Sequence, residues 1–329
     1  MRTMLLAGLA LLIGWSAYWW LAASSLRNGI DDWLTARQAD GWIAEYADLG
    51  ISGYPSRVDA RFDDLALADP ARGWAWSAPA FQILALSYRD DQVILAFPGE
   101  QSLATPRGRV TVSGAPLRAS VNLTEDQVVQ RLVAEADDLT LTMEGDQITA
   151  TRMILATEEQ GQPRIQRLGL TGEGIMPSAA LRELGAGIGL ADTPIERVTL
   201  DATATFAAPP GLAQLGDAPP ALDALSIADL SVTWAMLSIR AQGMLTADAN
   251  GFASGEIALR LRNWQEMLDM AVAAGAIRAD VAPALQFALG LMAGLGGDRD
   301  ALDATVSFRD GVMAIGPVVI GTAPRMALP

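Results

Sequence analysis

The acidic side chains are the main candidates for chemistry in this sequence of 329 residues, because the other usual reactive groups are missing. The chain has no His and no Cys, and all of its cations are Arg, since no Lys occurs. It therefore lacks a side chain that titrates near neutral pH, a thiolate nucleophile and a Schiff-base amine. Zinc and haem sites, and catalysis by Ser-His-Asp, Cys-His or Ser-Lys groups, are excluded on the same ground.

Adjacent acidic residues recur along the chain and could supply general acid and base groups. The pairs are Asp31-Asp32, Asp63-Asp64, Asp90-Asp91, Asp137-Asp138 and Glu158-Glu159. An acid-base hydrolase needs two carboxyl groups roughly 5–10 Å apart that face one substrate. Neighbouring residues of a strand point to opposite faces, so none of these pairs is itself such a dyad, although carboxylates from distant strands could converge. Solvated turns are the favoured interpretation, and we expect no catalytic residues, no cofactor and no metal site.

The segment "TADANGFASGEI" has some features of a calcium-binding loop. Asp248, Asn250 and Gly251 are correctly spaced among themselves. The first and last ligand positions would then fall on Thr246 and Ile257, which cannot supply the required carboxylates. The Asn-Gly pair is the strongest short signal for a β-hairpin, which is what we predict here.

Trp74 and Trp76, in "GWAWSAPAF", lie on one face of a predicted strand. Two aromatic rings in this arrangement could receive a lipid chain or a sugar. Large aromatic side chains more often fill a core, so we expect both to pack inside the protein.

Residues 4–23 carry no charge and predict a helix that remains in a membrane. At about 1.5 Å per residue they span roughly 30 Å, the thickness of a hydrocarbon core. The end of this run is rich in rings that favour the headgroup level of a membrane, namely Trp15, Tyr18, Trp19 and Trp20. A cleaved signal peptide, for which Ala22 and Ser24 are small enough, and a buried core helix remain alternatives. We predict a membrane anchor over residues 1–24.

The charges beside the anchor do not choose its orientation, because Arg2 precedes it and Arg27 and Arg37 follow it. The short head before the apolar run resembles an export signal. We therefore expect a single-pass protein of the bacterial inner membrane with its bulk in the periplasm. The net charge of −15, without a basic cluster, argues against nucleic-acid partners.

A helical neck is predicted over residues 25–41. Leu26, Ile30, Trp33 and Leu34 recur at helical spacing, and Gly41 lies where a helix would end. The neck could lie on the membrane surface or pack on the body as its first helix. The second alternative is favoured, because nearby Asp side chains would repel anionic lipid.

The body, residues 42–329, is predicted to be mainly β with an α+β character. Apolar and polar residues alternate in many runs, with turn signals at Gly145-Asp146, Asn250-Gly251 and Asp310-Gly311. We expect a long antiparallel meander of about 14–16 strands, which must curl into a groove or a two-layer sandwich. The run "AFQILALSY" is apolar on both faces, which calls for a second layer or a ligand. A solid sandwich core is the more ordinary interpretation.

A helical hairpin is predicted over residues 263–296. Asn263 and Glu266 have the spacing of a capping box, and a second apolar helix follows Pro283. The second helix is too short for a membrane span. Between the strands, "FAAPPGLAQLGDAPPALDAL" reads as a loop around two Pro-Pro pairs.

Three longer phrases, "GWAWSAPAFQILALSY", "LRNWQEML" and "SFRDGVMAIGPVVIGTAPRM", resemble the bacterial domain-of-unknown-function family 2125 nearly end to end. That resemblance implies an N-terminal membrane segment and no assigned activity. More loosely, the anchor, the long meander and the ending "RDGVMAIGPVVIG" are similar to AsmA-like envelope proteins, which implies an apolar β-groove for phospholipids.

The favoured function is therefore a non-catalytic envelope protein that binds or transfers an apolar ligand, such as a lipid, in a β-groove. One alternative is a periplasmic scaffold or assembly protein with a solid core. A second alternative is a carboxylate-dependent hydrolase.

Overall fold

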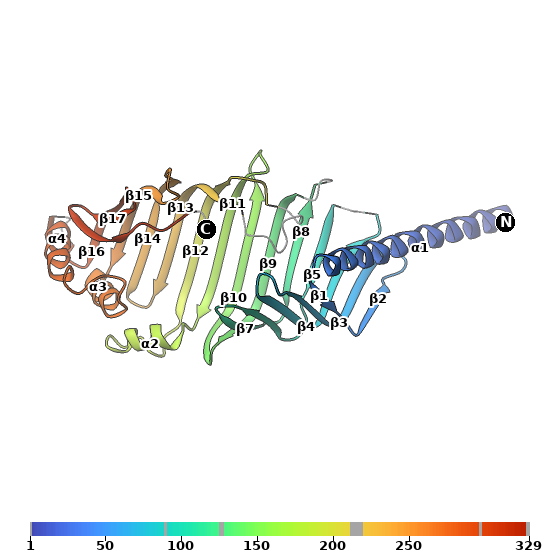
Figure 1. Ribbon diagram of the computed structural model, residues 1–329, viewed down its shortest axis with the longest axis horizontal. Helices are drawn as coiled ribbons and strands as arrows, with labels where there is room; N and C mark the ends of the chain where they lie inside the picture. Colours follow the sequence, from blue (N-terminus) through green and yellow to red (C-terminus); the bar gives the residue numbers. More distant parts are fainter. Residues whose placement is uncertain (1, 89–90, 125–127, 211–219, 296–297, 327–329) are drawn as a thin grey trace. The chain divides into compact units, whose positions relative to one another are not determined.

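The structure, a computed structural model, describes residues 2–88, 91–124, 128–210, 220–295 and 298–326 (Figure 1). The chain forms two compact units, of which the first comprises Met1–Glu125 with Ala134–Gly145, and the second Asp126–Val133 with Asp146–Pro329. The predicted mainly β class is confirmed, with antiparallel strands, an N-terminal apolar helix and helices near the C-terminus. The described residues form eighteen strands, slightly more than expected, because several strands of three to five residues are too short to show an alternating pattern.

The first unit consists of one long helix and a set of antiparallel strands. Its elements are α1 (Arg2–Ala39), β1 (Ile43–Glu45), β2 (Asp48–Ser52), β3 (Arg57–Asp69), β4 (Trp74–Leu86), β5 (Gln92–Ala96), β6 (Gln101–Thr105), β7 (Gly108–Ser113), β8 (Leu117–Leu123) and most of β9 (Val129–Met143). Strand β3 pairs with β1, β2 and β4, and β4 pairs further with β5 and β6. The remaining pairs described are β5–β8, β6–β7 and β7–β9.

Helix α1 packs on the sheet of the first unit with its C-terminal half. Leu26, Ile30 and Leu34 contact the buried cluster that includes Phe62. The helix ends at Ala39, and Gly41 adopts a φ of +88°, which a residue with a side chain rarely adopts. The structure thus agrees with the favoured interpretation, in which this stretch is the first helix of the body.

Strand β3 is irregular at Asp64, whose φ is +52°. Phe62 and Leu65 are three residues apart and would point to opposite faces of a regular strand. Both nevertheless belong to the buried cluster under α1, and the register between β3 and β4 is the same on either side of Asp64. On β4, Phe81 lies opposite Phe62 and packs against the same cluster.

The second unit is a meander in which each strand pairs antiparallel with the next in the chain (Figure 1). Its strands are β10 (Asp146–Glu159), β11 (Ile165–Ile175), β12 (Ile195–Phe206), β13 (Leu222–Trp234), β14 (Leu237–Ala247), β15 (Ala253–Arg262), β16 (Ala301–Arg309), β17 (Val312–Ile315) and β18 (Val318–Thr322). The predicted turns at Asn250-Gly251 and Asp310-Gly311 join β14 to β15 and β16 to β17. The predicted loop between β12 and β13 lies partly outside the described residues, which omit 211–219.

The predicted helical hairpin is present as α3 (Trp264–Ala273) and α4 (Ala282–Leu295). Buried side chains of both helices, including Trp264 and Leu285, pack against Leu302 of β16. The predicted capping box is wrong in its hydrogen bonds. Asn263 precedes α3 but has a φ of +54°, and its side chain donates to the backbone oxygen of Met236 instead of capping the helix.

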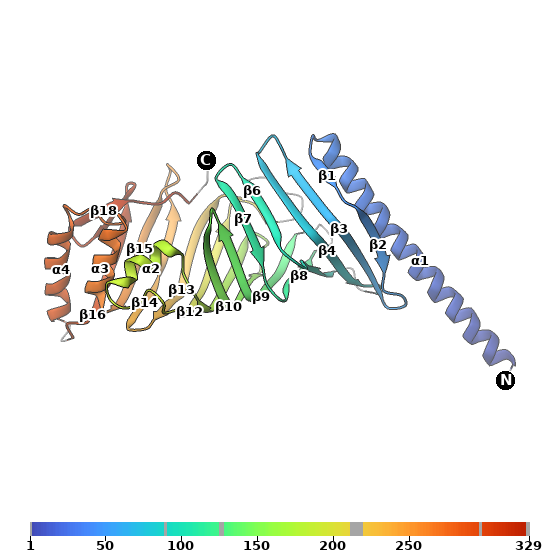
Figure 2. The same cartoon turned by 90° about the horizontal axis from the view of Figure 1, so that it is seen from below.

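A short helix, α2 (Ala179–Ala186), was not predicted. Its N-cap is Ser178, whose hydroxyl oxygen accepts a hydrogen bond from the backbone N–H of Leu181 at 3.4 Å. Together with the segment that follows it, α2 covers Trp234 and Leu237 near the turn that joins β13 to β14 (Figure 2). Eight residues give too few turns for a clear helical period. The serine at the N-cap was the sequence feature that could have indicated the start of this helix.

Candidate functional site

The predicted acidic pairs do not assemble into a site. Asp31 and Asp32 lie exposed on α1, and the other described pairs lie on β3, β9 and β10. Asp90 lies outside the described residues. Among those residues, no group of three or more His, Cys, Asp or Glu side chains could hold a metal ion.

Two buried carboxylates, Asp59 and Asp69, lie near the two ends of β3. At about 3.3 Å per residue they are roughly 30 Å apart, too far for a catalytic dyad. Each carboxylate forms a salt bridge with one arginine, Asp59 with Arg57 and Asp69 with Arg72 at 2.7 Å. Both therefore have a structural partner within their own strand or turn.

The Asp69 carboxylate organises the turn between β3 and β4. Oδ1 accepts the backbone N–H groups of Ala71 and Arg72, and Oδ2 accepts the Arg72 guanidinium. Burial alone would raise the pKa of Asp69, but the hydrogen bonds and charge of Arg72 outweigh it and hold the pKa below its ordinary value.

The segment considered as a calcium loop is the predicted β-hairpin. Asp248 Oδ1 accepts the backbone N–H groups of Asn250 at 2.8 Å and Phe252 at 2.9 Å. Gly251 has a φ of +79°, as the turn requires. The aspartate thus stabilises the turn itself.

The two predicted core tryptophans are half-buried, and each contacts other aromatic side chains of the first unit. Trp76 packs against the buried cluster under α1, with Phe81 5.5 Å away in an edge-to-face arrangement. Trp74 contacts Trp42 in the same manner at 4.9 Å. A depression of about 160 Å³ beside Trp76 is below the size of ordinary ligand pockets.

The N-terminal part of α1 is long and apolar enough to cross a membrane, with a mean hydropathy of 1.6 in its most apolar window. None of that window is buried inside the protein. A signal sequence would have the same length and composition. The helix could therefore anchor the protein in a membrane, and it continues without a break from the predicted anchor into the predicted neck.

Four consecutive contacts tie the end of this apolar stretch to the first unit. The contacts are Trp15 Nε1 to Pro55 O at 2.8 Å, Ser16 Oγ to Tyr54 Oη at 2.9 Å, Tyr18 Oη to Ser87 O at 2.6 Å and Trp19 Nε1 to Arg57 O at 2.6 Å. The aromatic donors that we assigned to a membrane interface are thus bonded to the backbone of the body.

One face of the second unit carries an apolar area that no buried cluster of the described residues includes, and we name it the apolar floor. Residues that pair directly across antiparallel strands share a face, so the strand register identifies its members. They are Met153, Leu155, Leu168, Leu170, Val198, Leu200, Val232 and Ile239, from β10 to β14. None of them is fully buried or belongs to a buried cluster, and Leu155 is 49% exposed.

Packed parts of the second unit border the apolar floor on two sides. Helices α3 and α4 cover β16, and the C-terminal residues around Ala323 cover part of β14 and β15. At another side, Gln166 is 1% exposed, and its amide donates to the backbone oxygen of Pro163. Among the described residues, the floor is thus an apolar area bordered by packed structure.

These observations define a mostly β protein that carries an N-terminal helix able to cross a membrane. The chain belongs to the family described as an uncharacterized protein conserved in bacteria (DUF2125), whose model matches residues 19–324. The predicted family is thereby confirmed. No curated protein and no solved structure matches the chain.

Proposed function

We propose that this protein is a non-catalytic envelope protein that shelters the acyl chain of a lipid on its apolar floor. The observation that carries the proposal is the floor itself, with eight apolar side chains on five adjacent strands outside every described buried cluster. Apolar area left in water is unfavourable by about 25 cal/mol per Å². An acyl chain would remove such area at about 0.8 kcal/mol for each buried methylene.

The size of the floor suits such a ligand. Five adjacent strands are separated by four spacings of about 4.8 Å, so the floor is roughly 19 Å across. That width is comparable to an extended acyl chain. The floor offers no charged side chain, so it would hold the chain rather than the headgroup.

The proposed place of action is the periplasmic side of the bacterial inner membrane, with α1 as a single-pass anchor. The length and apolar character of α1 support the anchor. Protease added to spheroplasts should then digest the body while α1 stays with the membrane. Full protection of the body would contradict this topology.

Site-specific photocrosslinking in the full-length, membrane-bound protein tests the lipid proposal. A benzophenone side chain placed at Leu155 faces the apolar floor, whereas one at Ile154 faces the opposite side of the same strand. We expect lipid adducts, identified by mass spectrometry of the extracted protein, at position 155 and not at position 154. Absence of adducts at 155, or equal yields at both positions, would overturn the proposal.

The alternative function, a scaffold for other proteins, is favoured by one observation on α4. Phe287 is 78% exposed and Leu291, one turn later, is 60% exposed, on a helix without any charged residue. An exposed apolar stripe of this kind can bind a partner protein. A benzophenone at Phe287 would then yield a protein-sized adduct that one at the neighbouring Gln286 does not.

A further inference from the structure

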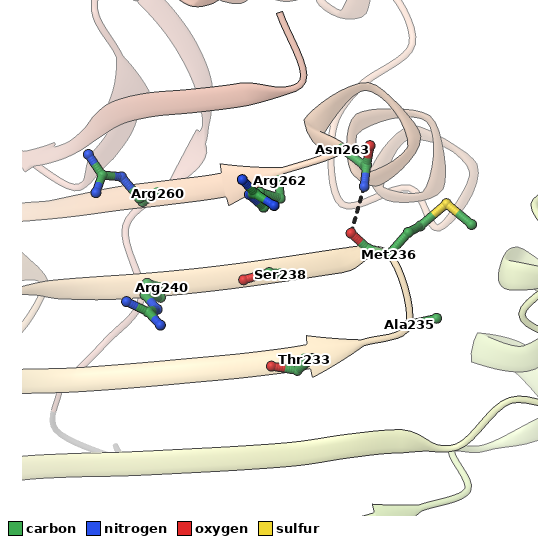
Figure 3. A pocket seen from close by; sticks show the side chains of 8 residues that line it. All are labelled: Thr233, Ala235, Met236, Ser238, Arg240, Arg260, Arg262 and Asn263. Atoms are coloured by element: carbon green, nitrogen blue, oxygen red, sulfur yellow. Dashed lines mark hydrogen bonds between the residues drawn. The ribbon is translucent and has the colours of Figure 1, made fainter. Parts of the chain in front are cut away.

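An open depression lies on the polar face of the second unit, at the ends of β13, β14 and β15 (Figure 3). Its volume is about 730 Å³. The side chains that matter for its chemistry are Thr233, Ser238, Arg240, Arg260, Arg262 and Asn263. We name it the arginine pocket. It lies on the side of the sheet opposite to the apolar floor, because Val232 and Ile239 of the floor alternate with Thr233, Ser238 and Arg240.

The strand register concentrates positive charge in the arginine pocket. Arg240 of β14 lies directly opposite Arg260 of β15, and Ser238 lies opposite Arg262. Like charges in directly opposed positions destabilise a sheet. Arg260 is neutralised on its other side by Asp303, with two hydrogen bonds of 2.7 and 2.9 Å.

Arg240 and Arg262 differ from most other arginines of this face. Arg167, Arg197 and Arg309 each form a salt bridge with a carboxylate at 2.7–2.8 Å. Among the described residues, Arg240 and Arg262 have no such partner and no hydrogen bond to another side chain or to the backbone. The chain has a net charge of −15, so two neighbouring arginines without a carboxylate partner are unusual in it. A bound anion would supply the missing negative charge.

Further donors border the two free arginines. The hydroxyl groups of Thr233 and Ser238 lie on neighbouring strands in directly opposed positions. Asn263 is held by its hydrogen bond of 2.6 Å to Met236, so α3 starts beside the pocket without a side-chain cap. The positive end of the helix dipole therefore adds to the charge of the arginines.

We propose that the arginine pocket binds a phosphate group carried by a phosphate ester or a lipid headgroup. Two guanidinium groups and two hydroxyls can donate hydrogen bonds to several phosphate oxygens at once. A carboxylate has only two oxygens and would leave some of these donors without an acceptor. Arg240 and Arg262 would hold the charge, and Ser238 and Thr233 would donate to the remaining oxygens. The proposal does not depend on lipid binding to the apolar floor.

The test is a calorimetric titration of the full-length protein in a nonionic detergent, with three probes. The probes are inorganic phosphate, glycerol 3-phosphate and dihexanoyl phosphatidylglycerol. The variant is R240Q/R262Q, and the control is R197Q/R309Q, which removes the same charge from the same face of the sheet. We expect saturable binding of at least one probe, with a Kd of about 1 mM or tighter.

The expected effect of R240Q/R262Q is a loss of affinity of at least about tenfold, or about 1.4 kcal/mol, with the control within about twofold of the natural protein. Binding of the two soluble phosphates supports a free phosphate ester, and binding of the lipid alone supports a headgroup. Absence of binding for all three probes, or an equal loss in both variants, would overturn the proposal. Thermal unfolding checks the fold, which should not suffer because R240Q relieves a like-charge pair.

Discussion

Trp19 donates its indole N–H to the backbone oxygen of Arg57 at 2.6 Å, so the apolar helix is fastened to the sheet near the middle of its length. Residues 4–14, which precede these contacts, cover only about 16 Å at 1.5 Å per residue. That is roughly half the thickness of a hydrocarbon core. If residues 4–23 span a bilayer while these contacts persist, the turn that carries Tyr54 and Pro55 must therefore lie within the depth of the membrane.

The first prediction concerns this attachment and exploits the absence of cysteine from the chain. In the variant S16C/Y54C, cysteines replace two residues whose hydroxyls are 2.9 Å apart, and the crosslinker bridges the space that the tyrosine ring leaves. A short bismaleimide should crosslink them in membranes, which a proteolytic digest and mass spectrometry would detect. The control L9C/Y54C places one thiol almost two turns away and should not react. Failure of S16C/Y54C to crosslink would show that the helix is detached from the body.

The second prediction concerns the acid sensitivity of the first unit. Because the pKa of Asp69 is lower in the folded protein than in the unfolded chain, its carboxylate stabilises the fold above the unfolded value of about 3.9. This stabilisation is lost as the pH falls through the folded pKa. We expect D69N to lower the urea midpoint at pH 7, and the gap to the natural protein to narrow towards about pH 3.

A matched control for D69N is D223N. Asp223 is exposed, and its Oδ2 lies 3.9 Å from Nη1 of Arg164. An exposed ion pair of this kind contributes about 0–1 kcal/mol to the free energy of unfolding. Its replacement should shift the midpoint little at either pH. A gap for D69N that stays constant between pH 7 and pH 3 would contradict the role assigned to its charge.

The third prediction distinguishes a β-turn from a calcium site at Asp248. D248A removes two hydrogen bonds to backbone N–H groups and should destabilise the second unit by about 1–3 kcal/mol. D248N keeps an oxygen acceptor and should recover most of that loss. Addition of Ca²⁺ or of a chelator should leave the unfolding midpoint of the natural protein unchanged. A rise of the midpoint with Ca²⁺ would restore the calcium interpretation.

Local patterns were sufficient for most of the fold. Alternation of apolar and polar residues identified the strands, and short turn signals such as Asn250-Gly251 placed the hairpins correctly. The prediction of the capping box was wrong because the side chain could form either of two hydrogen bonds. Asn263 has the spacing of a capping box, but it bonds to Met236 in the preceding strand turn, a tertiary contact that spacing cannot reveal.

The candidate surfaces were less accessible from the sequence, because both depend on strand register. Leu155 and Leu170 share a face only because β10 and β11 pair at those positions. Arg240 and Arg260 likewise become neighbours through the pairing of β14 with β15. A one-residue shift in register would move either set to the opposite face, and no local pattern fixes that register uniquely.

The last prediction tests whether the apolar floor is open to a ligand or covered by protein. Leu155 is 49% exposed, whereas Leu302, on β16 in the same unit, is 1% exposed. L155Q should therefore lower the free energy of unfolding by less than about 1 kcal/mol, since much of the Leu155 side chain is already in water. L302Q places an amide in a packed core and should lower the free energy of unfolding by about 3 kcal/mol or more.

Urea unfolding of the two variants, after removal of bound lipid, gives this comparison directly. Lipid that binds only the folded protein raises the midpoint in proportion to its affinity, so added lipid should stabilise the natural protein more than L155Q. An Ile154 variant, I154Q, changes the opposite face of the same strand and should respond to lipid as the natural protein does. Equal costs for L155Q and L302Q would mean that the floor is covered, and the acyl chain would then have no place to bind.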